Sequence, residues 1–251
     1  MENFDLLGES VIQPLAQFNI THPFFNINIH TIVQTWIILG LIFLLLLPVS
    51  WLLKKKSSVA YYLITSFIDY FYTLCNQSLS SFSFNHFSFV TTLFIFIFSS
   101  NLFAAVPGIE EPTKDINTTL ALGLLSFLYT QIYAVKNHGI VEYLKEYFSP
   151  FFLMFPLNVV GKVASVVSLS FRLFGNIFGG FIISQIYLNL IKGSLIGESL
   201  NLLGCIEITI TFFFGIFEGF LQAFVFAMLT LTYLSIAIQQ ENPEPEAGET
   251  V

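Results

Sequence analysis

Charged side chains are scarce in this sequence. Only 10% of its 251 residues are Asp, Glu, Lys or Arg, whereas 55% are hydrophobic. A soluble globular domain carries roughly 25% charged residues, so this composition excludes an ordinary soluble protein. The few Lys and Arg residues form no basic surface, which excludes nucleic acid as a partner. These absences favour an all-α protein that crosses a membrane several times and contacts membrane lipid.

Cysteine is also rare, since the sequence contains only Cys75 and Cys205. Both lie in apolar runs and form no metal-binding or redox motif, so we expect packing roles for them. We expect no metal site and no cofactor. The N-terminus carries Glu2, Asp5 and Glu9 and no basic segment, so it does not have the pattern of a secretory signal peptide.

The apolar runs predict about five transmembrane helices. The expected spans cover residues 31–53, 87–106, 117–135, 151–191 and 199–239. One upright span needs only ~20 residues, so each of the last two runs contains either a hidden turn or one long, strongly tilted helix. Lys162 and Arg172 favour the tilted helix for residues 151–191, because tilt keeps charges against protein. Residues 59–79 predict an amphipathic helix rather than a span, and residues 140–147 a short polar helix or turn.

These elements form a single membrane-embedded helical domain over residues 31–240. Residues 1–30 predict an extramembrane N-terminal arm, and residues 241–251 a disordered acidic tail. Five lysines fall on one side of the predicted membrane and two on the other. They are Lys54, Lys55, Lys56, Lys136 and Lys145 against Lys114 and Lys192. The positive-inside rule therefore predicts an outer N-terminus and a cytoplasmic C-terminus.

Arg172 lies in an apolar run that has no acidic residue within ten positions on either side. A guanidinium stays charged and costs at least ~2.5 kcal/mol in hydrocarbon, so it must face protein or water. On a helix it shares one side with small or polar residues, which we call the small-residue stripe: Gly161, Ser165, Ser168, Arg172, Gly175, Asn176 and Gly179. This stripe predicts close approach of another surface. The alternatives are an arginine paired with a buried acid, or one that snorkels to the interface.

A second polar line lies in the last apolar run. Its members are spaced by four, four, three and four residues: Glu207, Thr211, Gly215, Glu218 and Gln222. On a regular helix they share one face, and Glu207 to Glu218 spans ~16 Å from the outer end toward the middle. Intramembrane carboxylates are candidates for function. The line suggests a proton path that stops at a fixed cation, or an acid that merely neutralises Arg172 or Lys162. The pairs Gly175/Gly179 and Gly215/Gly219 predict close packing of the two long helices.

The segment Arg172-Leu173-Phe174-Gly175-Asn176, followed by Gln222 in 221–226 and by Tyr233-Leu234-Ser235, resembles subunit a of the F-type ATP synthase membrane sector. Residues 101–107 and 117–120 also resemble that family, and the likeness covers roughly residues 26–238. Glycine at position 175 is more typical of bacterial than of mitochondrial members.

The resemblance implies a non-catalytic, proton-conducting stator subunit that forms two half-channels against a rotating ring of c subunits. It also implies b subunits and the rest of the ATP synthase as partners, in a bacterial inner membrane or, alternatively, a mitochondrial one. Arg172 would separate the half-channels. The expected ion-path residues are Arg172, Asn176, Gln222, Glu218, Glu207, Asn101 and Ser168. The expected ring-facing small residues are Gly161, Ser165, Gly175 and Gly179.

The sequence differs from many members of that family at the outer half-channel. Phe181, Gly215, Ala104 and His30 stand where acids or histidine are common. Glu218, one turn from Gly215, could supply the missing carboxylate. A different class of function, a secondary ion transporter or antiporter with Arg172 as an anion site, would favour internal repeats and broken helices. No repeat is visible in the sequence.

Overall fold

The computed structural model describes residues 11–12, 27–54, 56, 58–79, 82–103, 111–148, 151–191, 209–210 and 212–238. The predicted acidic tail and most of the N-terminal arm lie outside these described residues. Within the arm, the two-residue strands β1 (Val11–Ile12) and β2 (Ile27–Asn28) pair antiparallel.

The rest of the described chain is helical. Its α-helices are α1 (Ile29–Leu52), α2 (Val59–Ser78), α3 (Phe84–Phe103), α4 (Ile116–His138), α5 (Ile140–Phe148), α6 (Phe155–Ile191) and α9 (Glu218–Ile238). Short 3-10 turns, η3 (Pro112–Lys114) and η4 (Phe152–Met154), precede α4 and α6. Among the described helices, five segments are long and apolar enough to cross a membrane, and α2 is not one of them. The all-α polytopic architecture is therefore confirmed.

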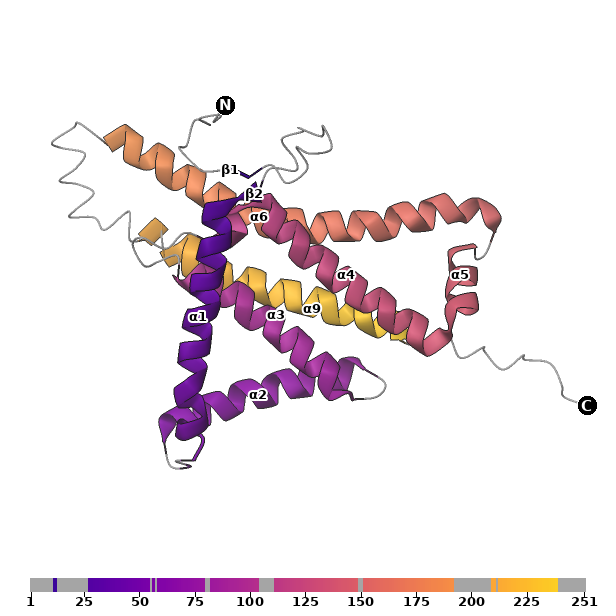
Figure 1. Ribbon diagram of the computed structural model, residues 1–251, viewed down its shortest axis with the longest axis horizontal. Helices are drawn as coiled ribbons and strands as arrows, with labels where there is room; N and C mark the ends of the chain where they lie inside the picture. Colours follow the sequence, from indigo (N-terminus) through magenta and orange to yellow (C-terminus); the bar gives the residue numbers. More distant parts are fainter. Residues whose placement is uncertain are drawn as a thin grey trace, which may run out of the picture.

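Helix α6 is one continuous helix of 37 residues. The alternative of a hidden turn in this run is therefore wrong. Pro156 is its second residue, a position where the missing backbone N–H is tolerated. At 1.5 Å per residue α6 is about 55 Å long, against a hydrocarbon thickness of about 30 Å. Such a helix must tilt or project beyond the hydrocarbon, and Figure 1 shows α6 and α9 running across the direction of α1.

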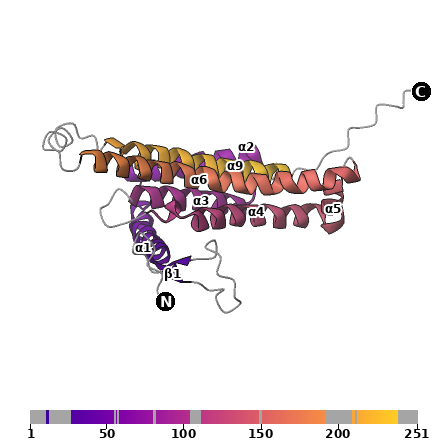
Figure 2. The same cartoon turned by 90° about the horizontal axis from the view of Figure 1, so that it is seen from above.

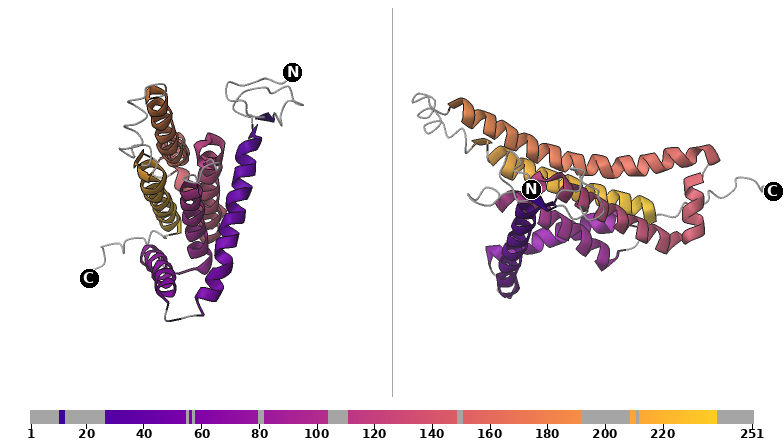
Figure 3. Two further views of the ribbon diagram at one scale, coloured as in Figure 1. Left: turned by 90° about the vertical axis from the view of Figure 1, so that its left-hand side faces the viewer. Right: turned by 45° about the horizontal axis from the view of Figure 1, so that its top comes forward.

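The helices form layers. Helices α6 and α9 lie side by side, α3 and α4 lie beneath them, and α1 packs on the far side of α3 (Figures 2 and 3). The core joins apolar side chains from α2, α3, α6 and α9. Its best-buried members include Cys75, Val90, Ile97, Leu173, Ala223, Phe226 and Leu234. This packing accounts for Cys75, whereas Cys205 lies outside the described residues.

The entry to α4 is tied to α1. Asp115 caps α4, since its Oδ1 accepts from the backbone N–H of Asn117 at 2.9 Å. Its other oxygen accepts from the Thr31 hydroxyl of α1 at 3.1 Å. Gly139, with φ of 81°, makes the turn between α4 and α5, where a left-handed conformation favours glycine.

The last apolar run departs from its expected regular helix. Residues Phe212–Phe217 form a π-helix, η5, which leads directly into α9. A π-helix bonds residue i to i+5, so it shifts the rotation of residues relative to those that follow. The four-residue spacing therefore no longer fixes the face on which Gly215 lies. Glu207 and Thr211 lie outside the described residues.

Candidate functional site

Arg172 lies on the exposed side of α6. The other side of this helix is buried against α4 and α9 through Leu169, Leu173 and Ile177. Among the described residues, none forms a hydrogen bond or ion pair with the guanidinium of Arg172. The alternative of a structural arginine paired with a described acid is therefore wrong, and the cation is directed toward the surroundings of the chain.

Every member of the small-residue stripe is at least partly exposed. Gly161, Ser168 and Gly175 are exposed, and the other small members, Ser165, Asn176 and Gly179, are partly exposed. A Cβ atom added at Gly161, Gly175 or Gly179 would meet no atom within 4 Å. This chain thus leaves a smooth surface, free of large side chains, on either side of Arg172.

The glycines that pack helices closely are different from the predicted ones. Gly175, Gly179 and Gly215 face open space within the chain, so for these three the predicted interhelical packing is wrong. Gly219 does pack closely, since a Cβ there would lie 2.6 Å from the Cβ of Asn101, but the neighbouring helix is α3 and not the predicted α6. On α6 the glycine that packs closely against the last helical run is Gly180, where a Cβ would lie 2.8 Å from the Cβ of Phe214 in η5. One position along a helix turns a residue by 100°, and the sequence alone does not fix that rotation.

Glu218, the first residue of α9, reaches across to α6. Its Oε1 accepts a hydrogen bond from Nδ2 of Asn176 at 2.7 Å, and the carboxylate is partly buried. Asn176 lies four residues, or about one turn, after Arg172. The structure therefore joins the two predicted polar lines at this contact. Within the described residues Glu218 pairs with neither Arg172 nor Lys162, which contradicts the reading in which it only neutralises a cation.

Asn101 is buried beside Gly219, the residue that follows Glu218, and has 1% of its surface exposed. Its Nδ2 donates to the carbonyl oxygen of Gly219 at 3.3 Å, and its Oδ1 accepts from the hydroxyl of Thr113 at 3.0 Å. Thr113 belongs to η3 and is fully buried. A line of polar groups thus runs from η3 through Asn101 to the start of α9. Sequence reasoning missed Thr113, whose signal is its place in the polar loop that follows the α3 span.

Gln222 is also buried, one turn after Glu218, with 5% of its surface exposed. Its Nε2 has no hydrogen-bond partner among the described residues. A buried donor without a partner costs about 1–3 kcal/mol. This amide therefore has unused capacity to bind a polar group within the bundle.

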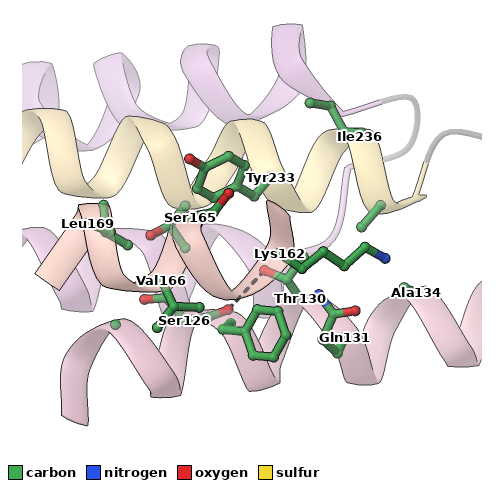
Figure 4. Close-up of a pocket in the computed structure, with 14 residues that line it drawn as sticks. Ser126, Thr130, Gln131, Ala134, Lys162, Ser165, Val166, Leu169, Tyr233 and Ile236 are labelled. Atoms are coloured by element: carbon green, nitrogen blue, oxygen red, sulfur yellow. Dashed lines mark hydrogen bonds between the residues drawn. The ribbon is translucent and has the colours of Figure 1, made fainter. Parts of the chain in front are cut away.

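A cavity of about 150 Å³ lies between α4, α6 and α9, near the C-terminal ends of α4 and α9. We call it the Lys162 cavity (Figure 4). Its polar lining comes from all three helices and comprises Ser126, Thr130, Gln131, Lys162, Ser165, Thr230 and Tyr233. The Ser126 hydroxyl is buried and has no hydrogen-bond partner among the described residues. A cavity of this volume has room for several waters, and these polar side chains offer them hydrogen-bond partners.

Sequence reasoning missed the α4 wall of this cavity. Ser126 and Thr130 are four residues apart on one face of α4, and that spacing is the signal that could have found them. Ser165 belongs to both the cavity lining and the small-residue stripe. It lies seven residues, about 10 Å of helix axis, before Arg172.

The positions that differ from the resembled family have identifiable surroundings. The ring of Phe181 lies 4.9 Å from the Lys114 ammonium, measured to the ring centroid. Gly215 lies within η5. His30 is the second residue of α1, and its backbone N–H donates to Asn28. Ala104 lies outside the described residues. Across the described part of the chain, no three His, Cys, Asp or Glu residues cluster in a way that could hold a metal ion.

Comparison with known proteins connects this geometry to a family. The family described as "ATP synthase A chain" matches residues 32–235. The chain is 35% identical over 209 residues to "ATP synthase subunit a" of Moorella thermoacetica, covering 82% of this chain and 88% of that relative. It is 33% identical over 220 residues to "ATP synthase subunit a 2" of Picosynechococcus, covering 85% and 88%. The chain therefore belongs to the subunit a family of F-type ATP synthases, in its bacterial type, and is a multi-pass membrane protein.

Proposed function

We propose that this chain is the proton-conducting stator subunit of its ATP synthase and that Arg172 separates two half-channels. The observation that carries the proposal is the open stripe around Arg172, with polar groups leading toward it from two opposite directions. A ring of c subunits would move along the stripe and carry protons on carboxylates. The chain itself performs no bond chemistry on ATP.

The outer half-channel would use Thr113, Asn101, Glu218 and Asn176. The hydrogen bonds from Thr113 to Asn101 and from Asn101 to Gly219 support this order, because they lead to the residue beside Glu218. The hydrogen bond from Asn176 to Glu218 then brings the carboxylate to the helix of Arg172. Gln222 would offer its free amide to the same region. Glu207 would continue the path outward, and Ser168 would belong to the ion path beside Arg172.

The inner half-channel would use the Lys162 cavity. Its polar lining supports this assignment, as does Ser165, which belongs to both the cavity and the stripe. Gly161, Gly175 and Gly179 would face the ring together with Ser165, since none of the three glycines is covered by this chain. Bulkier side chains there would obstruct the ring as it turns.

Arg172 would act through its fixed charge. At about 4 Å and an effective dielectric constant of about 20, a guanidinium and a carboxylate attract by about 4 kcal/mol, which equals about three pKa units. A neutral ring carboxylate that meets Arg172 would therefore release its proton. Because a guanidinium does not lose its own proton, Arg172 would also block direct passage between the half-channels.

The chain would contact c subunits, b subunits and the remainder of the ATP synthase in the inner membrane of a bacterium, and its membership of the subunit a family supports this. Lysine asymmetry supports an outer N-terminus and a cytoplasmic C-terminus. Each proton that crosses would draw about 2.3 kcal/mol per 100 mV of membrane potential. Whether the ring carries H⁺ or Na⁺ is set by the ring's own carboxylate site.

The test is ATP-driven proton pumping by the assembled complex in inverted vesicles. Arg172→Ala should abolish pumping while the complex still assembles. Val163→Ala is the matched control, because Val163 is an exposed residue on another face of α6, and it should pump normally. Normal pumping by Arg172→Ala would refute the proposed role of the arginine.

A further inference from the structure

Helix α5 has three distinct faces, although it is only nine residues long. Ile140, Val141, Leu144 and Phe148 form an apolar face and are 65%, 67%, 50% and 37% exposed. Glu142 and Lys145 lie on a second, charged face. Tyr143 and Tyr147 form the third. Segregation of this kind is typical of helices that lie in a membrane interface. The predicted short helix is therefore confirmed, but its purely polar character is wrong, because one face of α5 is apolar.

The apolar face continues along the chain into η4. Phe151, Phe152 and Leu153 are 69%, 76% and 84% exposed. The ring of Phe148 stacks on those of Phe152 and Phe155, with centroids 5.4 Å and 4.9 Å apart. The candidate span of α4 ends at His138, just before α5, and the next candidate span begins at Phe152, within η4, and continues through α6 (Figure 1). Both adjoining spans also expose apolar side chains close to this segment, such as Ile132 on α4 and Leu157 on α6.

The tyrosine face holds α5 to the two neighbouring spans. Tyr143 donates from its hydroxyl to Oε1 of Gln131 on α4, and the two tyrosine hydroxyls bond to each other. On the α6 side, Asn158 donates to the carbonyl oxygen of Tyr147 at 2.9 Å. The Lys162 ammonium lies 4.1 Å from the ring centroid of Tyr147 and 5.0 Å from that of Tyr143. These distances are within the range of cation–π attraction.

We propose that α5 and η4 form an interfacial anchor that lies in the boundary between lipid headgroups and acyl chains. The apolar face enters the boundary of the acyl chains, and the charged face remains in water. The tyrosine face binds the first two turns of α6. The anchor thereby fixes the depth and tilt of the helix that carries Arg172. Lipid is the occupant, rather than another protein, because both adjoining candidate spans also expose apolar side chains near this segment, Ile132 on α4 and Leu157 and Val160 on α6.

Spin labels test the occupant directly. In the full complex, rebuilt in liposomes with Cys75 and Cys205 replaced by alanine, labels go on Val141→Cys, Leu144→Cys and, as the matched control, Glu142→Cys. We expect positions 141 and 144 to collide several-fold more with oxygen than with a water-soluble nickel chelate, and position 142 to show the reverse. Free access of nickel to all three positions would overturn the proposal. Protection of positions 141 and 144 from both reagents would also overturn it, since a protein partner would then cover the face.

A second measurement tests whether the tyrosine face holds the start of α6 in place. A spin label at Leu157→Cys, an exposed position in the first turn of α6, reports the motion of that turn. Tyr147→Leu removes the ring beneath Lys162, whereas Tyr147→Phe retains it. We expect the label to become more mobile and to change depth with leucine but not with phenylalanine. Equal spectra with tyrosine, leucine and phenylalanine at position 147 would show that the ring of Tyr147 does not hold α6.

Discussion

Replacing Glu218 with glutamine tests whether this residue relays protons in the proposed outer half-channel or only supports the structure. Glutamine has the same shape and still accepts from Asn176, so the loss in stability should stay near 1 kcal/mol, because only the charge assistance of the 2.7 Å hydrogen bond is lost. The amide cannot take up and release a proton. Since positioned proton-transfer groups contribute about 10²–10⁴-fold, we expect pumping to fall at least tenfold. The assay is ATP-driven quenching of a pH dye in inverted vesicles, with assembly followed on native gels.

A carboxylate introduced at position 215 should partly restore pumping in the Glu218→Gln variant. A side chain there would meet no atom within 4 Å of its Cβ, so Gly215→Glu has room for a carboxylate. Combined with Glu218→Gln, it should restore part of the pumping if a carboxylate in this region is what the path requires. If Glu218→Gln instead abolishes assembly, the residue is structural. If Glu218→Gln pumps at the normal rate, Glu218 does not belong to the path.

Three further predictions follow from particular contacts. Gly219→Ala should destabilise the protein by about 1–3 kcal/mol in thermal unfolding, because its Cβ would overlap Asn101, whereas Gly179→Ala should have almost no effect. Arg172→Lys should also lose coupled pumping, because an ammonium that the ring shields from water can lose its proton and a guanidinium cannot. Retained pumping would argue against a need for the fixed charge. Burial raises the pKa of the Cys75 thiol, so maleimide should modify it in the intact complex far more slowly than after denaturation, and should gain rate only well above the ordinary thiol pKa of about 8.5. Rapid labelling of Cys75 in the folded complex would contradict its place in the core.

The helical framework was accessible from sequence because lipid permits few backbone arrangements. Apolar length alone identified the spans, and local chemistry set several ends close to the predicted ones. Asp115 caps α4, and Pro156 suits the first turn of α6. The length of α6 followed from the same pattern, because no glycine or proline interrupts the run strongly enough to make a turn.

The rotation of each helix about its axis and the contacts between residues far apart in the chain could not be predicted from the sequence. The contact between Asn176 and Glu218 joins residues 42 positions apart, and no periodicity within either helix specifies it. The π-helix η5 also has no simple sequence signal, because its bonding differs from the α-helix by a single residue. The sequence suggests an acid as the partner of Lys162, whereas the structure places two tyrosine rings beside it. These two tyrosines lie on a separate short helix, which only the fold brings beside Lys162.

The arrangement of α6 gives a physical reason why a second molecule must complete the proposed path. The Lys162 cavity ends at Val166 and Leu169, and the buried face beyond it continues with Leu173. Ser170 is the polar residue on this face, but its hydroxyl donates to the backbone carbonyl of Val166 within the helix. Between the cavity and Asn176, the buried face of α6 therefore offers a proton no polar side chain that is free to relay it. On the proposed mechanism the proton must leave from the exposed stripe, where Arg172 prevents direct passage and a carboxylate of the ring can carry it past.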